Sequence, residues 1–91
     1  MAYNWKFDKK ANKYFSKKID KEIQKRIISW LNLHIKNTYD PRAYGKALSG
    51  SFTGFWRYRV GKYRIIADIK DEEHIVTITK IDKRGDVYKK A

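Results

Sequence analysis

Three arginines in the segment 55–66 are the residues best suited to chemistry in this chain. The segment reads Phe-Trp-Arg-Tyr-Arg-Val-Gly-Lys-Tyr-Arg-Ile-Ile, and its arginines are Arg57, Arg59 and Arg64. A guanidinium presents a planar fork of donors that matches the oxygens of a phosphate. Three such groups on one surface would bind a phosphate and stabilise the extra negative charge that develops on it during a reaction.

The same segment predicts a tight β-hairpin that would hold these arginines. Gly61-Lys62 is a two-residue connection typical of a type II′ turn. The predicted cross-strand pairs are Val60–Tyr63, Arg59–Arg64, Tyr58–Ile65 and Arg57–Ile66. Because side chains alternate along a strand, a core face would carry Trp56, Tyr58, Val60, Tyr63, Ile65 and Ala67. The three arginines would then share the opposite face with Ile66.

Arg59 and Arg64 would lie directly across the ladder from each other. Like charges in this position destabilise a sheet by up to ~1 kcal/mol, and an anion held between them would remove the repulsion. The alternative is that arginines on a solvated sheet face splay apart into water. Three arginines on one face favour a phosphate ligand.

Composition indicates one folded domain, residues 1–91, with an acidic partner. The chain is 42% hydrophobic and has 22 Lys and Arg against 10 Asp and Glu, a formal charge of +12. This charge favours nucleic acid or an acidic protein over a membrane surface as partner. The absence of cysteine excludes disulfides, thiolate metal sites and cysteine nucleophiles. No apolar run reaches the ~20 residues of a membrane span, so we expect a soluble, cytoplasmic protein.

Two helices are predicted before the hairpin. Tyr3, Trp5 and Phe7 alternate with polar residues, which indicates a short N-terminal strand, and Asp8 is a plausible N-cap. The first helix would have an apolar side formed by Ala11, Tyr14 and Phe15. A longer helix would begin near Asp20 and end near Asn37, with apolar positions at Ile19, Ile23, Ile27, Trp30, Leu31 and His34.

These helices are expected to pack as a helical hairpin on the apolar face of a three-stranded antiparallel sheet, an α+β fold. Trp30 and Leu31 would be buried against Trp56 and Tyr58. His34 is interpreted as an edge-of-core histidine, because its helical neighbours are apolar.

Residues 40–54 read as a connecting loop with Leu48 as its anchor, and Arg42 and Lys46 would extend the basic surface. The acidic run 71–73 is interpreted as a solvent turn, since a metal site needs converging ligands. A strand follows over 75–81, and its pattern leaves open which face is buried.

The chain resembles the RelE/ParE superfamily of bacterial type II toxin–antitoxin toxins, and its RelE branch more closely. The resemblance rests on the element order, on the hairpin segment, and on the ending Lys83-Arg84-x-Asp86-Val87-Tyr88. It implies a ribosome-dependent endoribonuclease that cuts mRNA and is blocked by a cognate antitoxin. The implied catalytic set is Arg57, Arg59, Arg64, Arg84 and Tyr88. We expect Lys46, Lys62 and Lys83 to bind RNA, and no metal or other cofactor to be needed.

One departure from the family concerns proton transfer. Many relatives have Gly-His-Arg before the terminal tyrosine, where this chain has Asp82, Lys83 and Arg84. A histidine general acid at that place is therefore excluded. The 2′-hydroxyl of RNA can attack the adjacent phosphate, so positioning, charge stabilisation and proton transfer suffice. Tyr88 would either transfer a proton or stack on a base.

Two other functions share these features. A ParE-like toxin would bind DNA gyrase and have no nuclease activity. A non-catalytic module would bind phosphates and stack bases without cleavage.

Overall fold

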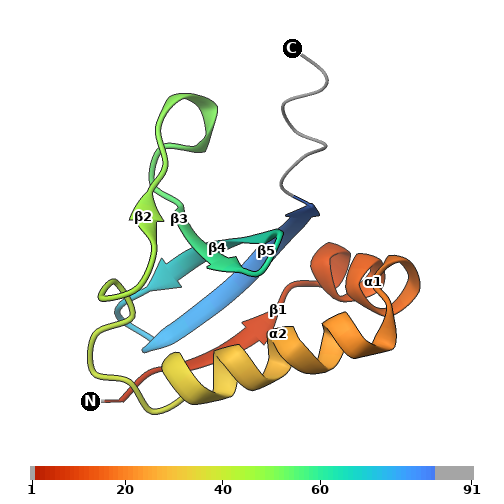
Figure 1. The fold of residues 1–91 in the computed structure, drawn as a ribbon. Coiled ribbons are helices and arrows are strands. Elements are labelled where there is room, and N and C mark those ends of the chain that lie inside the picture. Colours follow the sequence, from red (N-terminus) through yellow and green to blue (C-terminus); the bar gives the residue numbers. More distant parts are fainter. Residues whose placement is uncertain (1, 84–91) are drawn as a thin grey trace.

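A computed structural model describes residues 2–83, so the predicted site residues Arg84 and Tyr88 lie outside the described residues. The elements are β1 (Asn4–Phe7), α1 (Lys9–Lys18), α2 (Lys21–His34), β2 (Lys46–Ala47), the 3₁₀-helix η1 (Gly50–Phe52), β3 (Trp56–Val60), β4 (Tyr63–Lys70) and β5 (Ile75–Lys83) (Figure 1). The α+β class is confirmed. None of the described helices has the length and apolar character that a bilayer crossing requires.

The sheet has five strands rather than the predicted three. Its order is β1-β5-β4-β3-β2, with β1 parallel to β5 and every other pair antiparallel. The N-terminal strand was predicted, but its place in the sheet was not, because parallel pairing joins segments distant in sequence. β2 pairs only Lys46 and Ala47 with β3, inside the segment predicted to be a loop.

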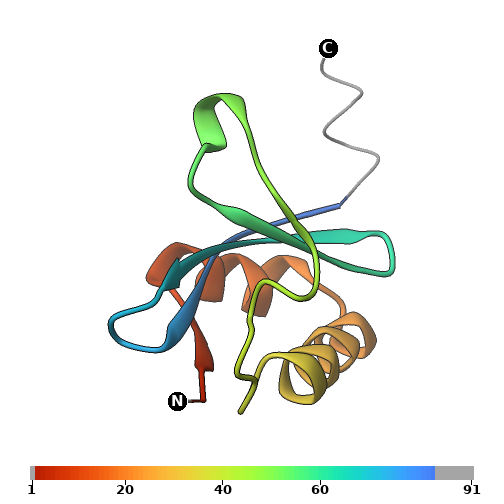
Figure 2. The same ribbon diagram turned by 90° about the vertical axis from the view of Figure 1, so that its left-hand side faces the viewer.

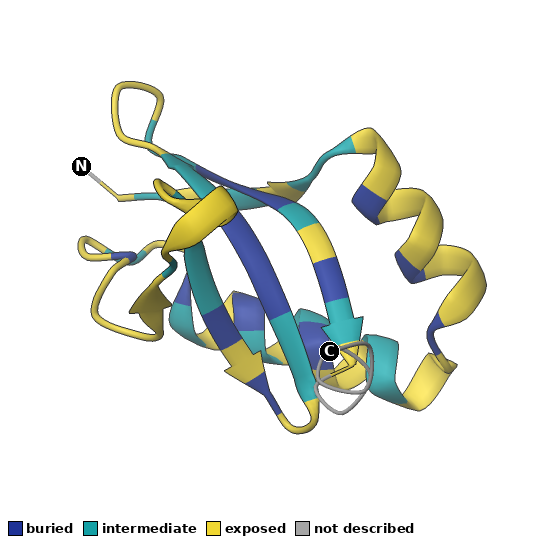
Figure 3. Cartoon of the chain, turned by 90° about the horizontal axis from the view of Figure 1, so that it is seen from above, coloured by how far each residue is buried: buried dark blue, intermediate teal, exposed yellow. Residues whose placement is uncertain are grey.

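The predicted hairpin register is confirmed at all four pairs. Gly61 has a φ of 60°, the conformation that the predicted turn requires of its first central residue. On the core face Tyr58, Val60, Ile65 and Ala67 are buried. In β4 and β5 the buried positions form runs, residues 65–67 and 76–78, rather than a strict alternation (Figure 3).

Both helices lie on this core face of the sheet (Figures 1 and 2). The Asp8 side chain caps α1 by accepting a 2.8 Å hydrogen bond from the Ala11 N–H, as predicted. Asp20 occupies the N-cap position of α2 but makes no capping hydrogen bond with its side chain. α2 ends at His34, before the predicted Asn37.

The centre of the core joins α2 to β3. Leu31 and Tyr58 are fully buried as predicted, whereas Trp30 is only half-buried, with its ring centroid 5.4 Å from that of Tyr58. Burial raises the pKa of the Tyr58 phenol, whose hydroxyl donates a 2.6 Å hydrogen bond to the Pro41 carbonyl. Trp56 is only half-buried, and its indole N–H donates to the Tyr44 carbonyl at 2.6 Å.

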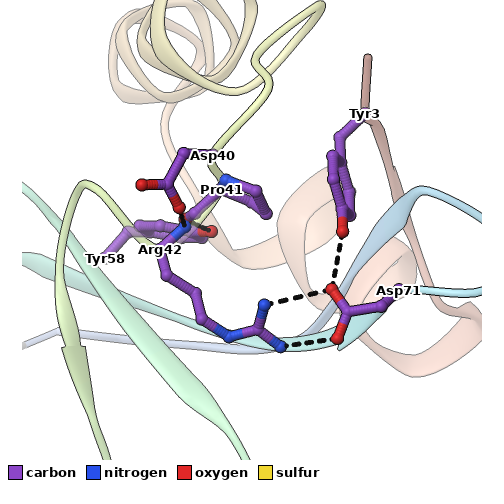
Figure 4. Close-up of polar contacts among 6 residues, drawn as sticks. All are labelled: Tyr3, Asp40, Pro41, Arg42, Tyr58 and Asp71. Carbon is purple, nitrogen blue, oxygen red and sulfur yellow. Dashed lines mark hydrogen bonds and ion pairs between the residues drawn. The ribbon is translucent and has the colours of Figure 1, made fainter. Parts of the chain in front are cut away.

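A polar clasp holds the connection between α2 and β2 against the far end of the sheet (Figure 4). The Arg42 guanidinium donates to both oxygens of Asp71, at 3.0 and 2.9 Å, and the Tyr3 hydroxyl donates to the same carboxylate at 2.6 Å. Asp71 thus lies in the predicted solvent turn but is paired. The hydrogen bonds from Arg42 and then Tyr3 lower the pKa of Asp71 to about 2.

We predict that Asp71→Asn lowers the free energy of unfolding by about 0.5–1 kcal/mol at pH 7, a modest loss because solvent screens this half-exposed group. A carboxylate whose pKa is lowered on folding stabilises the fold above its ordinary pKa of 3.8, and this contribution is lost as pH falls towards 2. The difference from wild type in urea unfolding should therefore be constant above about pH 4 and shrink below it. Glu72→Gln in the same turn is the control, and an equal loss there would contradict the role of the clasp.

Gly45 marks the point where this connection touches β3. Its φ is 86°, and a Cβ there would lie 2.0 Å from the Arg57 carbonyl oxygen. Gly54 also has a positive φ, 98°, but a Cβ there would meet open space. Both alanine variants should lose about 1–2 kcal/mol of stability from backbone strain, and Gly45→Ala at least ~1 kcal/mol more. Equal losses in thermal unfolding would show that the contact with β3 is unimportant.

Candidate nucleic-acid interface

The sheet face opposite the helices carries two rows of charged residues. The strand register aligns Arg59, Arg64 and Asp82 in one row. It aligns Lys46, Arg57, Ile66 and Lys80 in the next. We call the five cations of these rows, Lys46, Arg57, Arg59, Arg64 and Lys80, the cationic face. The predicted convergence of three arginines on one sheet face is thus observed.

Two of these arginines are partly removed from water. Arg57 and Arg64 are half-buried, and their buried Nε atoms make no hydrogen bond within residues 2–83. Ile66, which is opposite Arg57 in the strand register and two residues from Arg64 along β4, is only 3% exposed. Arg59 is exposed. Charge–charge interactions are stronger beside buried apolar groups than in bulk water, so an anion here would be bound more firmly than on an open surface.

Asp82 is the carboxylate in these two rows, and it neutralises them only in part. Its Oδ2 lies 3.6 Å from Nη2 of Arg64 and 3.8 Å from Nζ of Lys80. Both distances exceed those of a charge-assisted hydrogen bond. Asp82 offsets the repulsion that Arg64 experiences from Arg59, and the cations remain in excess.

An aromatic arm borders the cationic face. The segment 46–55 rises on the side of the sheet away from the helices (Figure 2). Its η1 helix places the Phe52 ring 5.6 Å from Nζ of Lys80, and this side chain is 41% exposed. Exposed aromatic rings beside cations are typical of surfaces that stack nucleic-acid bases. Sequence reasoning missed Phe52 and Lys80, because their proximity depends on how the arm folds over β5.

The predicted RNA-binding lysines fall into two groups. Lys46 lines a cleft of about 440 Å³ together with Arg57 and Arg59. Lys62 and Lys83 line a different cleft, of about 540 Å³, at the turn of the hairpin. Only Lys46 therefore belongs to the cationic face, while Lys62 and Lys83 form a separate basic surface.

His34 is an edge-of-core residue, as predicted. It is half-buried, and its ring lies 4.8 Å from Trp30 and 4.7 Å from Tyr44. Across residues 2–83, no three histidine or carboxylate side chains are grouped so that they could hold a metal ion. Leu48, the predicted anchor of the loop, is half-buried and lies outside the main core cluster.

Known proteins are similar to this chain in sequence and architecture. The family model for the ParE toxin of the type II toxin–antitoxin system parDE matches residues 6–88. The chain belongs to the RelE/ParE toxin superfamily. This confirms the resemblance seen in the sequence.

Solved structures of RelE-type toxins are similar to this chain. The toxin–antitoxin complex RelBE2 of Mycobacterium tuberculosis contains a chain with a TM-score of 0.80 and 25% identity, covering 92% of this chain and 93% of that one. The archaeal RelE–RelB complex of Pyrococcus horikoshii gives 0.69 and 25%, over 93% and 98%. Toxin RelG of M. tuberculosis is 35% identical over 51 residues, 56% of this chain. The match spans 59% of RelG, less than two thirds of it. The chain is therefore a RelE-like toxin of the type II class.

We predict that Asp82→Asn makes this RelE-like toxin less stable but more responsive to anions. Loss of the carboxylate leaves half-buried Arg64 without compensation, which should cost about 1 kcal/mol in low-salt buffer. Inorganic phosphate should then raise the melting temperature more in Asp82→Asn than in wild type. Asp68→Asn, which removes a carboxylate paired with Lys70 at 3.0 Å, is the control. An equal phosphate response in all three proteins would argue against an anion site at the cationic face.

Proposed function

We propose that this toxin is a ribosome-dependent endoribonuclease that cleaves mRNA by attack of a 2′-hydroxyl on the neighbouring phosphate. The main support is the convergence of Arg57, Arg59 and Arg64 on one sheet face, with two buried Nε donors that have no partner within residues 2–83. Guanidinium donors of this kind suit a phosphate whose negative charge increases in the transition state.

The reaction forms one bond to phosphorus and breaks another. The 2′-oxygen attacks phosphorus as its proton leaves, and the bond to the 5′-oxygen of the next nucleotide breaks as that oxygen gains a proton. The products are a 2′,3′-cyclic phosphate and a 5′-hydroxyl end. The arginines contribute by holding the phosphate and stabilising its added charge, and RNA supplies the nucleophile.

The family resemblance implies that Arg84 and Tyr88 belong to the catalytic set, and both lie outside the described residues. Tyr88 is the candidate for proton transfer. A tyrosine has an ordinary pKa of about 10, so action as a base requires a strongly cationic environment. The cationic face would provide it. If Tyr88 instead stacks on a base, a lysine or arginine must carry the proton.

The side chains of the cationic face explain why cleavage would depend on the ribosome. In the described part of the chain, its charged rows carry one carboxylate and no histidine. Efficient general acid–base catalysis without help would need such groups in matched pairs. The ribosome would therefore orient the RNA, and the charge of +12 would favour docking on ribosomal RNA through release of counterions.

We propose a cognate antitoxin as the second partner. The RelBE2 and RelE–RelB structures named above are complexes of related toxins with their antitoxins. An acidic or amphipathic antitoxin segment would cover the cationic face or displace an adjacent helix. A segment that covers the face would compete with RNA for the same guanidinium groups.

A ParE-like action on DNA gyrase is the alternative, and the description of the matching family model favours it. Such a toxin would need no phosphate-binding arginines arranged for cleavage. The arginine geometry therefore supports the nuclease over gyrase inhibition.

We predict that purified toxin added to a coupled translation reaction produces codon-phased mRNA cuts, mapped by primer extension. Arg57→Ala, Arg59→Ala and Arg64→Ala should each reduce the cleavage rate by about 10²–10³-fold, as loss of one transition-state donor does. Lys25→Ala, which removes an exposed cation from the helical side, should retain wild-type cleavage.

The outcomes separate the candidate functions. Cuts that persist in all three arginine variants would contradict the proposed role of the cationic face. Gyrase-dependent DNA breaks without mRNA cuts would establish the ParE-like alternative. RNA binding with neither activity would identify a non-catalytic module.

A further inference from the structure

A cleft at the edge of the sheet overlaps the cationic face at Lys46, Arg57 and Arg59, and its aromatic residues have no role in the chemistry proposed above. β2 pairs with β3 only at Arg57 and Trp56, so the edge of β3 beyond Arg57 is open within the described residues. The cleft lies there, with a volume of about 440 Å³. This is within the usual range for sites that bind small molecules.

One wall of the cleft is aromatic. Trp30 and Tyr44 line it, with ring centroids 6.0 Å apart, and the His34 ring centroid lies 4.7 Å from that of Tyr44. Tyr44 is 40% exposed, so part of this side chain is accessible to solvent. An exposed ring beside two other rings offers a planar surface for a nucleobase.

Contacts within the protein hold this wall in place before any ligand binds. The Tyr44 carbonyl accepts the 2.6 Å hydrogen bond from the Trp56 indole, and Gly45 packs directly on the Arg57 carbonyl. The clasp between Arg42 and Asp71 fixes the start of the same segment. A wall that is already ordered binds a ligand at a lower entropic cost than a flexible one.

The other wall is cationic. It consists of Lys46, Arg57 and Arg59, and no carboxylate residue lines the cleft. The cleft therefore places aromatic rings beside cationic side chains. This combination is typical of sites for single-stranded RNA, whose unstacked bases are free to insert.

We propose that the edge cleft binds one unpaired RNA nucleotide, with its base against Tyr44 and Trp30 and its phosphate at Lys46. The inference rests on the proposed function, because this nucleotide would neighbour the phosphate that Arg57, Arg59 and Arg64 hold for cleavage. The cleft would then give the toxin a preference for one base beside the cut.

The test uses short single-stranded RNA with 2′-fluoro groups at every position, which removes the nucleophile and leaves binding intact. Each position is replaced in turn by an abasic nucleotide, and affinity is measured by fluorescence anisotropy. One abasic position should weaken binding to wild type roughly tenfold, the effect of losing one base–aromatic stack. Tyr44→Ala should weaken binding of the intact RNA by the same factor, and the abasic nucleotide should then cost nothing further.

Two variants serve as controls. Tyr44→Phe keeps the ring and should bind within about twofold of wild type, which separates stacking from the loss of the hydroxyl. Tyr39→Ala removes a tyrosine that is 79% exposed in the same connection and outside the cleft, and it should have no effect. Thermal unfolding confirms that each variant is folded at the assay temperature.

Additive losses from Tyr44→Ala and the abasic nucleotide would overturn the proposal, as would unchanged RNA affinity in Tyr44→Ala. Tyr44→Ala that loses affinity for a strand-forming antitoxin peptide, but not for RNA, would assign the open β3 edge to protein instead. Codon-phased cleavage without base-dependent binding would refute the cleft and retain the nuclease. Base-dependent binding without any cleavage would retain the cleft and refute the nuclease.

Discussion

The two-residue turn at Gly61-Lys62 is the constraint on which the rest of the molecule depends. It fixes which residues of β3 and β4 face each other, and side chains alternate between the two faces of a sheet with a period of two. A shift of one residue would move Tyr58 out of the core and carry Arg57 and Arg59 towards the helices. The energy of the buried face therefore also determines the position of the cationic face, since the same register sets both.

Because one strand register sets both faces of the sheet, the protein tolerates positive charges on the cationic face that are only partly neutralised. Arg59 faces Arg64, and Asp82 compensates for the repulsion only at 3.6 Å from Arg64. Such a surface weakens the fold by itself, but the residues that stabilise the sheet lie on the opposite side, where Tyr58, Ile65 and Ala67 are fully buried. Unfavourable electrostatics can then persist where an anion would relieve them, at a cost of about 1 kcal/mol that burial of a few side chains offsets.

The sequence was most informative where one local signal determined the geometry. The glycine turn predicted the register, Asp8 predicted a cap, and 3.6-residue periodicity predicted α2. The place of β1 could not be predicted, because no local pattern indicates that Asn4 pairs with Ile75 at the other end of the described chain. The same limit applies to the site. The arginine face followed from the register, whereas the contact of Phe52 with Lys80 and the clasp between Arg42 and Asp71 depend on how long connections fold back over the sheet.

Fold alone does not separate a nuclease from a gyrase inhibitor in this superfamily, since RelE-like and ParE-like toxins share it. The distinction must come from the surface. A protein partner is recognised mainly through apolar and aromatic anchors, and it leaves few buried donors without a partner. The cationic face has the opposite character: the buried Nε atoms of Arg57 and Arg64 have no partners in residues 2–83, and the Ile66 side chain opposite Arg57 is buried. Donors held in this way, beside a cleft that pairs aromatic rings with cations, match a ligand that carries both phosphates and bases.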